Sequence, residues 1–156
     1  MSPLLRERIV PLATILTPNQ FEAELLAETS ITDVASACVA MDKLHARGAK
    51  AVLITSTNLP AGQTDTMLLI ASCPWEWVAD DADRWASGSG TAAVAAAATS
   101  EGHAAADRGS HARFTVTIPV LPMVFTGTGD LTAALLLAHA HDHPAAFATA
   151  VEKAIA

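Results

Sequence analysis

The chain has 156 residues, of which 51% are hydrophobic and 16% are charged, and its formal net charge is −7. This composition is typical of a globular protein rather than a disordered one, and the length suffices for one hydrophobic core. The negative net charge argues against nucleic acid and anionic membranes as partners. Cys38 and Cys73 lie far apart and have neither zinc nor redox spacing, so we expect both to be reduced thiols.

The N-terminal region carries Arg6, Glu7 and Arg8 where a signal peptide would have an apolar segment. No apolar run approaches the roughly 20 residues that a membrane-spanning helix needs. We therefore expect a cytoplasmic protein.

The residue pattern predicts strands and helices in alternation. The predicted elements are a helix end at 2–10, a strand at 13–16, helices at 18–27 and 32–47, strands at 51–54, 67–71 and 114–118, and helices at 130–141 and 145–156. Short, fully apolar strands such as 51–54 are typical of buried parallel strands. The pattern therefore predicts the α/β class, with a mainly parallel sheet of about four or five strands flanked by helices. Helix 130–141 is apolar almost all round, which predicts burial.

Residues 74–113 differ from the rest of the chain. An acidic stretch at 80–83 is followed by Ser and Gly at 87–90 and by an alanine-rich tract. This composition predicts a low-complexity insert at 74–113 that forms a surface loop, with a weak helix at 91–98. We expect Trp75, Trp77 and Trp85 to pin this insert to the body rather than to cover a ligand.

A glycine-rich motif, Phe125–Asp130 (FTGTGD), runs directly into an apolar helix. Glycines let the backbone approach a ligand closely, and the first N–H groups of a helix point outward as an anion site. Asp130 adds a carboxylate beside that site, which suits a base that takes a proton from an attacking hydroxyl. The tetrapeptide alone is equally compatible with a simple turn before a helix.

A second motif, Thr17–Glu22 (TPNQFE), has the features of a helix start. Thr17 suits the N-cap, and Gln20 completes a predicted capping box with it. Asn19 and Glu22 share one face of the first turn, close to the C-terminal end of the preceding strand. Open α/β sheets bind ligands at that edge.

Thr55 and Ser56 follow the strand at 51–54 and so reach the same edge. A hydroxyl-rich loop start without a function is the alternative interpretation. His139 and His143 lie four apart, which permits a metal site, but histidines near a helix C-terminus are also favoured by the helix dipole. We favour the second interpretation for them.

Three segments together resemble the pyridoxal kinases, a branch of the ribokinase-like superfamily, with the eukaryotic enzymes nearest. They are Thr17–Leu26, Val52–Ser56 and Phe125–Leu131, and the resemblance extends over residues 6–70 and 119–156. It implies ATP-dependent phosphorylation of the 5′-hydroxyl of pyridoxal, pyridoxine or pyridoxamine in vitamin B6 salvage. It also implies a homodimer that uses ATP, Mg²⁺ and a monovalent cation, K⁺ or Na⁺.

The resemblance assigns a role to each motif residue. Asp130 corresponds to the general base, and Gly127, Thr128 and Gly129 correspond to the anion hole. The remaining assignments are Asn19, Thr55, Ser56 and Thr128 at ATP, Glu22 with Asn19 at the magnesium ion and its waters, and Thr17 at the monovalent-cation site.

The family has further strands, substrate-gripping residues and part of its metal site in a segment that precedes these motifs. We therefore expect residues 1–156 to be the C-terminal, nucleotide-binding part of a ribokinase-like kinase domain. Two alternatives remain open. The chain could belong to another kinase of the superfamily, such as a hydroxymethylpyrimidine kinase, or it could be a truncated, non-catalytic nucleotide-binding or interaction protein.

Overall fold

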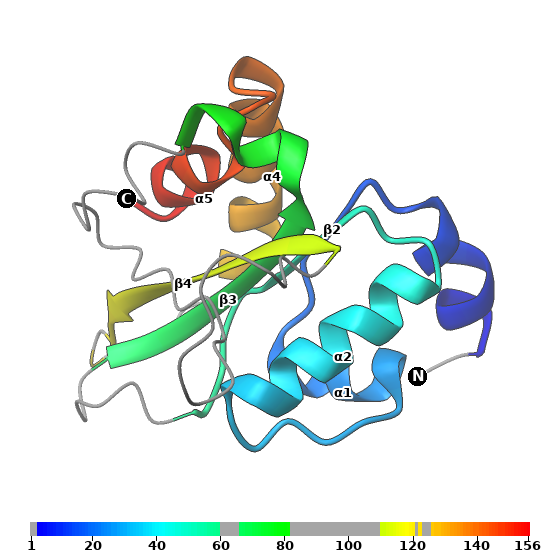
Figure 1. Ribbon diagram of the computed structural model, residues 1–156. Coiled ribbons are helices and arrows are strands. Elements are labelled where there is room, and N and C mark those ends of the chain that lie inside the picture. The colour runs from blue at the N-terminus through cyan, green and yellow to red at the C-terminus, as the bar shows by residue number, and fades with distance from the viewer. Residues whose placement is uncertain (1–2, 60–65, 82–109, 121, 123–125) are drawn as a thin grey trace, which may run out of the picture.

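A computed structural model describes residues 3–59, 66–81, 110–120, 122 and 126–156 (Figure 1). In chain order the elements are η1 (Leu5–Ile9), η2 (Val10–Leu12), β1 (Ile15–Leu16), α1 (Gln20–Ala27), α2 (Val34–Ala46), β2 (Ala51–Ile54), β3 (Thr66–Pro74), η3 (Trp75–Asp81), β4 (His111–Pro119), α4 (Thr128–Asp142) and α5 (Phe147–Ile155). The predicted α/β class and the predicted order of strands and helices are confirmed.

The four strands form one sheet in the order β1-β2-β3-β4. β1 and β2 are parallel, but β2 and β3 are antiparallel, and so are β3 and β4. The prediction of a mainly parallel sheet is therefore wrong, and the sheet is mixed. Residues 55–65 alone join β2 to β3, and a parallel crossover needs a dozen residues or more, usually including a helix.

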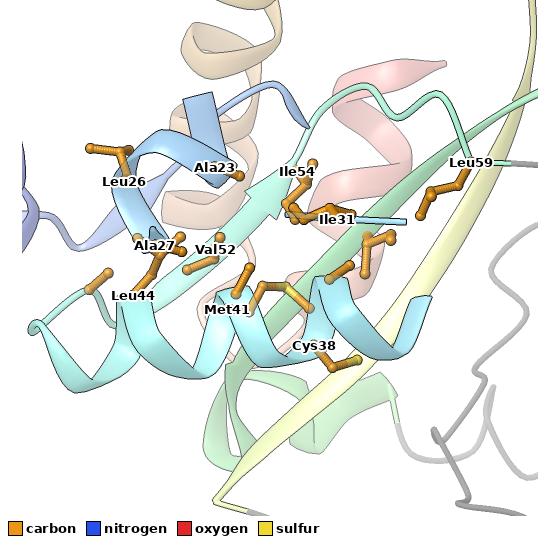
Figure 2. Packing of buried hydrophobic residues seen from close by; sticks show 14 of the residues in the cluster. Ala23, Leu26, Ala27, Ile31, Cys38, Met41, Leu44, Val52, Ile54 and Leu59 are labelled. Carbon is orange, nitrogen blue, oxygen red and sulfur yellow. The ribbon is translucent and has the colours of Figure 1, made fainter. Parts of the chain in front are cut away.

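Helices cover both faces of this sheet, so the chain has three layers (Figure 1). Alternate residues of β2 point to opposite faces, as the twofold period of a strand requires. Val52 and Ile54 join a core with α1 and α2, while Leu53 packs with α4 and α5 on the other face. Figure 2 shows the first of these cores, in which Met41 and Leu44 of α2 face β2.

Helix α2 has the amphipathic pattern that the sequence predicts. Asp33 is its N-cap and forms a capping box with Ser36. Its apolar stripe is buried, and it includes Cys38, whose thiol is free like that of Cys73. Burial raises the pKa of the Cys73 thiol to about 12, so this thiol stays protonated at physiological pH.

Helix α4 does not match its prediction. Only Leu136 of this helix is buried, while Leu131, Leu135 and Leu137 are exposed. The reason is that α4 packs mainly against α5, and a helix with one neighbour buries one stripe of its surface. Apolar residues on every side of α4 therefore do not indicate burial on every side.

The start of the predicted insert is part of the ordered fold. Residues 66–74 form β3, and η3 continues it to Asp81, whose carboxylate is buried and not part of a surface patch. Asp81 accepts hydrogen bonds from the backbone N–H of Ala148 (3.0 Å) and the hydroxyl of Thr149 (2.7 Å). It thereby caps α5 from a distant part of the chain.

Trp77 packs edge-to-face against Phe147, with ring centroids 5.7 Å apart, and so fixes η3 to α5. At the other end of the predicted insert, residues 111–113 belong to β4. Trp85, the Ser and Gly stretch and the predicted helix at 91–98 lie outside the described residues. An insert within 82–109 therefore remains a prediction.

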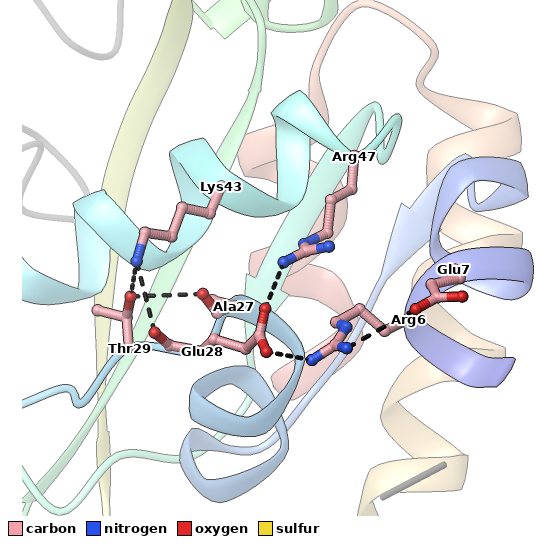
Figure 3. Close-up of polar contacts among 7 residues, drawn as sticks. All are labelled: Arg6, Glu7, Ala27, Glu28, Thr29, Lys43 and Arg47. Carbon is pink, nitrogen blue, oxygen red and sulfur yellow. Dashed lines mark hydrogen bonds and ion pairs between the residues drawn. The ribbon is translucent and has the colours of Figure 1, made fainter. Parts of the chain in front are cut away.

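Polar contacts join the N-terminal turns to α1 and α2 (Figure 3). Glu28 ends α1 with a left-handed backbone, at φ 52° and ψ 49°. Its carboxylate forms ion pairs with Arg6 and Arg47, and Lys43 contacts Thr29 close by. The side chain of Glu28 thus holds three segments together at the surface.

Candidate functional site

A cavity of about 540 Å³ lies beyond the C-terminal ends of β1 and β2, at the N-terminus of α4. Its lining residues are Thr17, Asn19, Glu22, Thr55, Ser56, Met67, Leu69, Ile118, Pro119, Val120, Thr128, Gly129, Asp130, Thr132, Ala133 and Ile155. Every predicted site residue except Gly127 is among them. Segments more than 100 residues apart in the sequence therefore meet at one cavity, as the resemblance implies.

The N-terminus of α4 forms one wall of the cavity. Gly127 is the N-cap, with φ 82°, and its carbonyl accepts the first hydrogen bond of the helix from the N–H of Leu131 at 3.0 Å. The N–H groups of Thr128, Gly129 and Asp130 precede that bond in the first turn. They supply the positive end of the helix dipole to the cavity.

Two glycines have different reasons to be at this turn. Gly127 needs its positive φ, which other residues rarely adopt. A Cβ atom built on Gly129 meets no heavy atom within 4 Å, so packing within the described protein does not require a glycine there. Gly129 lines the cavity, so its missing side chain leaves the backbone there open to a ligand.

Asp130 is the third residue of α4, exposed and directed to the same cavity by its place in the first turn. The helix begins at Thr128, two residues earlier than predicted. Asp130 is therefore the third residue of the helix rather than its first. An acid at this position is favoured by the helix dipole and also stands beside the anion-binding N–H groups.

Asn19 is the N-cap of α1, which corrects the prediction of Thr17 for that position. The Asn19 side chain accepts from the N–H of Glu22 at 2.9 Å, and Glu22 Oε2 accepts from the N–H of Asn19 at 3.0 Å. The capping box is therefore formed by Asn19 and Glu22, not by Thr17 and Gln20. This reciprocal pair uses one oxygen of Glu22, and its other oxygen, Oε1, lies outside the capping box.

Thr55 and Ser56 are held beside α1 by backbone hydrogen bonds. The N–H of Thr55 donates to the carbonyl of Pro18 at 3.0 Å, and the N–H of Gln20 donates to the carbonyl of Ser56 at 3.0 Å. These bonds continue the parallel pairing of β1 and β2 past the ends of both strands. Both hydroxyl residues thereby reach the wall of the cavity.

The sequence did not identify the apolar part of the wall. Its members come from β3, β4 and the residue that follows it, α4 and α5: Met67, Leu69, Ile118, Pro119, Val120, Ala133 and Ile155. The alternation of apolar residues along the strands was the available signal for this wall. It shows only that these residues share a face of the sheet. Which loop that face meets depends on tertiary structure.

Charge in the cavity is negative. Glu22 and Asp130 contribute carboxylates, and no Lys, Arg or His appears among the described residues that line it. A polyphosphate in this cavity would meet helix N–H groups and hydroxyls but no cationic side chain of the described wall. A bound cation is the simplest way to offset that repulsion.

The histidines at the C-terminal end of α4 form no metal site in the described structure. His143 Nε2 lies 2.8 Å from the ammonium of Lys153, which donates to it. Within the described ranges, His, Cys, Asp and Glu side chains nowhere gather in a group of three or more that could hold a metal ion.

Comparison with known proteins places the chain in a family. A family model described as phosphomethylpyrimidine kinase matches residues 2–113, which is well over half of the chain. The chain belongs to this family. Its curated relatives include the pyridoxal kinase of Homo sapiens, 35% identical over 153 residues, and that of Sus scrofa, 37% identical over 153 residues.

Those alignments cover 98% of this chain but only 41% and 39% of the relatives. The chain thus spans about two fifths of the length of the curated relatives it matches. Among solved structures, pyridoxal kinase from Leishmania donovani in complex with ADP and pyridoxamine is similar, with a TM-score of 0.67 at 30% identity. That match covers 96% of this chain and 40% of the other, and it confirms the ribokinase-like α/β fold.

Among the described helices, none combines the length and the apolar character that crossing a membrane requires.

Proposed function

We propose that this chain is the nucleotide-binding part of a kinase that transfers the γ-phosphoryl group of ATP to the 5′-hydroxyl of pyridoxal, pyridoxine or pyridoxamine. One observation carries the proposal. The helix N-terminus at Thr128, the acid Asp130 and the hydroxyl pair Thr55 and Ser56 line one cavity of about 540 Å³. That combination supplies an anion site, a base and phosphate contacts in the same place.

The proposed chemistry is an in-line displacement at phosphorus. The vitamer hydroxyl oxygen forms a bond to the γ-phosphorus while the bond from that phosphorus to the bridging oxygen breaks, and ADP leaves. Asp130 accepts the hydroxyl proton. The N–H groups of Thr128 and Gly129 donate to the transferring phosphoryl oxygens, where negative charge is concentrated in the transition state.

The residues present fit a magnesium ion held mainly by phosphate oxygens and water. Glu22 Oε1 lies outside the capping box and is a hard oxygen donor, the type that Mg²⁺ prefers. Asn19 stands beside it as the cap of the same helix. When bound, Mg²⁺ neutralises phosphate charge, which this acidic cavity requires. Thr17 lines the cavity as well and is proposed as a ligand of a monovalent cation, K⁺ or Na⁺.

The apolar wall suits the flat, weakly polar base of the nucleotide. Ile118 lies at the end of β4, Val120 follows it, and Ile155 lies at the end of α5. Apolar side chains of this kind bury an aromatic ring, while the polar groups opposite fix its phosphates. Similar pyridoxal kinase structures from Leishmania donovani were solved with ADP, which supports a nucleotide in this cavity.

A second candidate is phosphorylation of a hydroxymethylpyrimidine, and the description of the matching family model favours it. The groups proposed to bind ATP, the phosphate donor, are the same for either substrate. The residues that distinguish the two acceptors are not identified in the described part of the chain.

Binding of ATP tests the nucleotide part of the proposal. Calorimetric titration of the 156-residue chain with MgATP should give a saturable signal that is lost when EDTA removes the magnesium. The absence of binding with MgATP would contradict the proposal.

Turnover tests the acceptor. Two fusions place the preceding segment of a pyridoxal kinase or of a hydroxymethylpyrimidine kinase ahead of this chain. The first should phosphorylate pyridoxal faster than the second phosphorylates hydroxymethylpyrimidine, and the reverse order would favour the second candidate. Asp130→Asn should lower kcat by at least about 100-fold with little change in ATP affinity. Asp142→Asn, at the far end of α4, is the matched control and should leave both values unchanged. Retained turnover in Asp130→Asn would reject Asp130 as the base.

The homodimer and a cytoplasmic location remain proposals from the resemblance. Sedimentation equilibrium of the purified chain tests the first, and imaging of a tagged chain in cells tests the second.

A further inference from the structure

Gln20 makes more contacts between segments than its place in the motif suggests. Its backbone N–H donates to the carbonyl of Ser56 at 3.0 Å. Its side-chain Oε1 accepts from the backbone N–H of Asn58 at 2.7 Å, and its Nε2 donates to the carbonyl of Ile31 at 2.8 Å. One residue thereby joins the start of α1, the loop after β2 and the turn before α2.

The contact with Asn58 extends a ladder of hydrogen bonds. Backbone bonds link Thr55 to Pro18 and Gln20 to Ser56, where the strands β1 and β2 have already ended. The next rung along the loop, at Asn58, is made by the Gln20 side chain in place of a backbone carbonyl. The carboxamide therefore holds the loop in register with α1 past the point where the backbones separate.

The two bonding partners of the Gln20 carboxamide determine which way its oxygen and its nitrogen point. The Asn58 N–H can only donate and the Ile31 carbonyl can only accept, so the oxygen must face the loop and the nitrogen must face the turn. A carboxylate could accept from Asn58 but would be repelled by the Ile31 carbonyl oxygen. A glutamine is therefore required for both bonds.

Glu24 provides an internal comparison on the same helix. One turn after Gln20, its Oε1 accepts from the N–H of Ile31 at 2.7 Å. Gln20 and Glu24 thus hold the two polar groups of one residue in the α1–α2 turn. Only Gln20 also contacts the loop that carries Thr55 and Ser56.

We infer that Gln20 is a positioning residue, which fixes the Thr55–Asn58 loop so that the Ser56 and Thr55 hydroxyls face the nucleotide phosphates. The inference rests on the proposed function for its consequence, since Thr55 and Ser56 are proposed phosphate contacts. Loss of the Gln20 side chain leaves the Thr57 hydroxyl bond to Leu68 (2.8 Å) and the backbone rungs, so the loop stays attached but loses its last restraint.

The test compares Gln20→Met with Glu24→Met. Methionine keeps the length and helix propensity of both side chains and removes their hydrogen bonds, so both variants lose one contact with Ile31. Amide hydrogen exchange of Asn58 in the nucleotide-free chain should be about 5- to 10-fold faster in Gln20→Met and unchanged in Glu24→Met, as expected for one lost hydrogen bond. Equal exchange of Asn58 in the two variants would overturn the inference.

The second readout separates positioning from general destabilisation. At similar melting temperatures, Gln20→Met should bind MgATP about 5- to 10-fold more weakly than Glu24→Met does. Equal affinities would show that Gln20 has a structural role only. If Gln20→Met does not fold, Gln20→Glu replaces it, and Asn58 should then exchange at a rate between those of the unsubstituted chain and a freely exposed amide.

Failure of the two proposals gives different results. If the unsubstituted chain does not bind MgATP, the proposed function is contradicted, while the Asn58 exchange rates still decide whether Gln20 fixes the loop. If MgATP binds and Asn58 exchange does not respond to Gln20→Met, the proposed function stands and the positioning role is rejected.

Discussion

Helices α2 and α4 lie on opposite faces of the sheet, and they use similar apolar content in different ways. α2 buries Ala37, Cys38, Ala40, Met41 and Leu44 along one stripe. α4 has more leucines but buries only Leu136, and Leu137 beside it is 68% exposed. The neighbours that a helix packs against therefore decide how much of its apolar surface is buried, and apolar content alone does not.

The two helices also differ in what they provide. α2 stabilises the fold through its side, whereas α4 contributes its N-terminal turn to the cavity. Substitutions along α2 should therefore act on folding, and substitutions in the first turn of α4 should act on binding. Asp130→Asn tests the binding half of that division, and the predictions below test the folding half.

The largest expected difference is between two leucines. Leu44→Ala in α2 removes a side chain with no exposed surface and should lower the free energy of unfolding by about 2–5 kcal/mol. Leu137→Ala in α4 should change it by less than about 0.5 kcal/mol, because that side chain is already largely in water. Urea unfolding followed by circular dichroism measures both. Similar losses in the two variants would show that α4 has a covered face that the structure does not place.

Much of the fold could be predicted from local pattern. The spacing of Met41 and Leu44 gave α2, and the apolar run at 51–54 gave β2 to the residue. Strand direction could not be predicted in the same way, because period-2 alternation is the same in both directions. The length of the 55–65 connection held the relevant information, since it is short for a parallel crossover.

Most of the predicted site residues come in compact motifs, so their grouping along the chain could be read from the sequence. Thr17–Glu22 and Gly127–Asp130 each place several groups by local geometry alone. No comparable motif marks Ile118 or Ile155, which reach the cavity only through β4 and α5. The role of Asn19 as N-cap was also missed, because Thr17 and Pro18 match the usual start pattern and the chain starts its helix two residues later.

Asp81 should have the next largest effect, on the α4–α5 face. Asp81→Ala removes the acceptor for the Ala148 N–H and the Thr149 hydroxyl and leaves the start of α5 without this cap. We expect a loss of about 1–3 kcal/mol in the free energy of unfolding. Asp80→Ala is the matched control, because its side chain is exposed, and it should cost less than about 0.5 kcal/mol. Equal results for the two variants would contradict the capping role.

A pH effect should arise where α2 meets β3 and β4. The His45 and His111 rings stack at 3.7 Å, and His45 contacts the Ala49 carbonyl (2.8 Å) and the Ser72 hydroxyl (3.0 Å). Burial lowers the pKa of His45, and of His111, below the usual value for histidine. The charged groups that face them are Asp42, Arg113 and Glu76.

Each histidine has a lower pKa in the folded chain than in the unfolded chain. At a pH between these folded and unfolded values, the unfolded chain therefore binds more protons than the folded chain. Stability from this pair is therefore fully present above about pH 6.5 and is lost as the pH falls below it. The urea midpoint should drop between pH 7.5 and pH 5. In His111→Phe, which keeps a ring against His45 and removes one titrating group, the drop should be smaller. An unchanged pH dependence in that variant would exclude His111 as a contributor.

The smallest effect should come from the surface contacts around Glu28, which join the N-terminal turns to α1 and α2. Glu28→Gln weakens ion pairs with Arg6 and Arg47, and such exposed pairs contribute about 0–1 kcal/mol. Glu28→Gly also loses these pairs, but glycine adopts the left-handed backbone at φ 52° without strain, which is worth about 1 kcal/mol. We therefore expect Glu28→Gly to be at least as stable as Glu28→Gln in thermal unfolding. If Glu28→Gly is clearly the less stable variant, the ion pairs outweigh the backbone strain, and the α1–α2 face depends on surface charge as well as on its packed core.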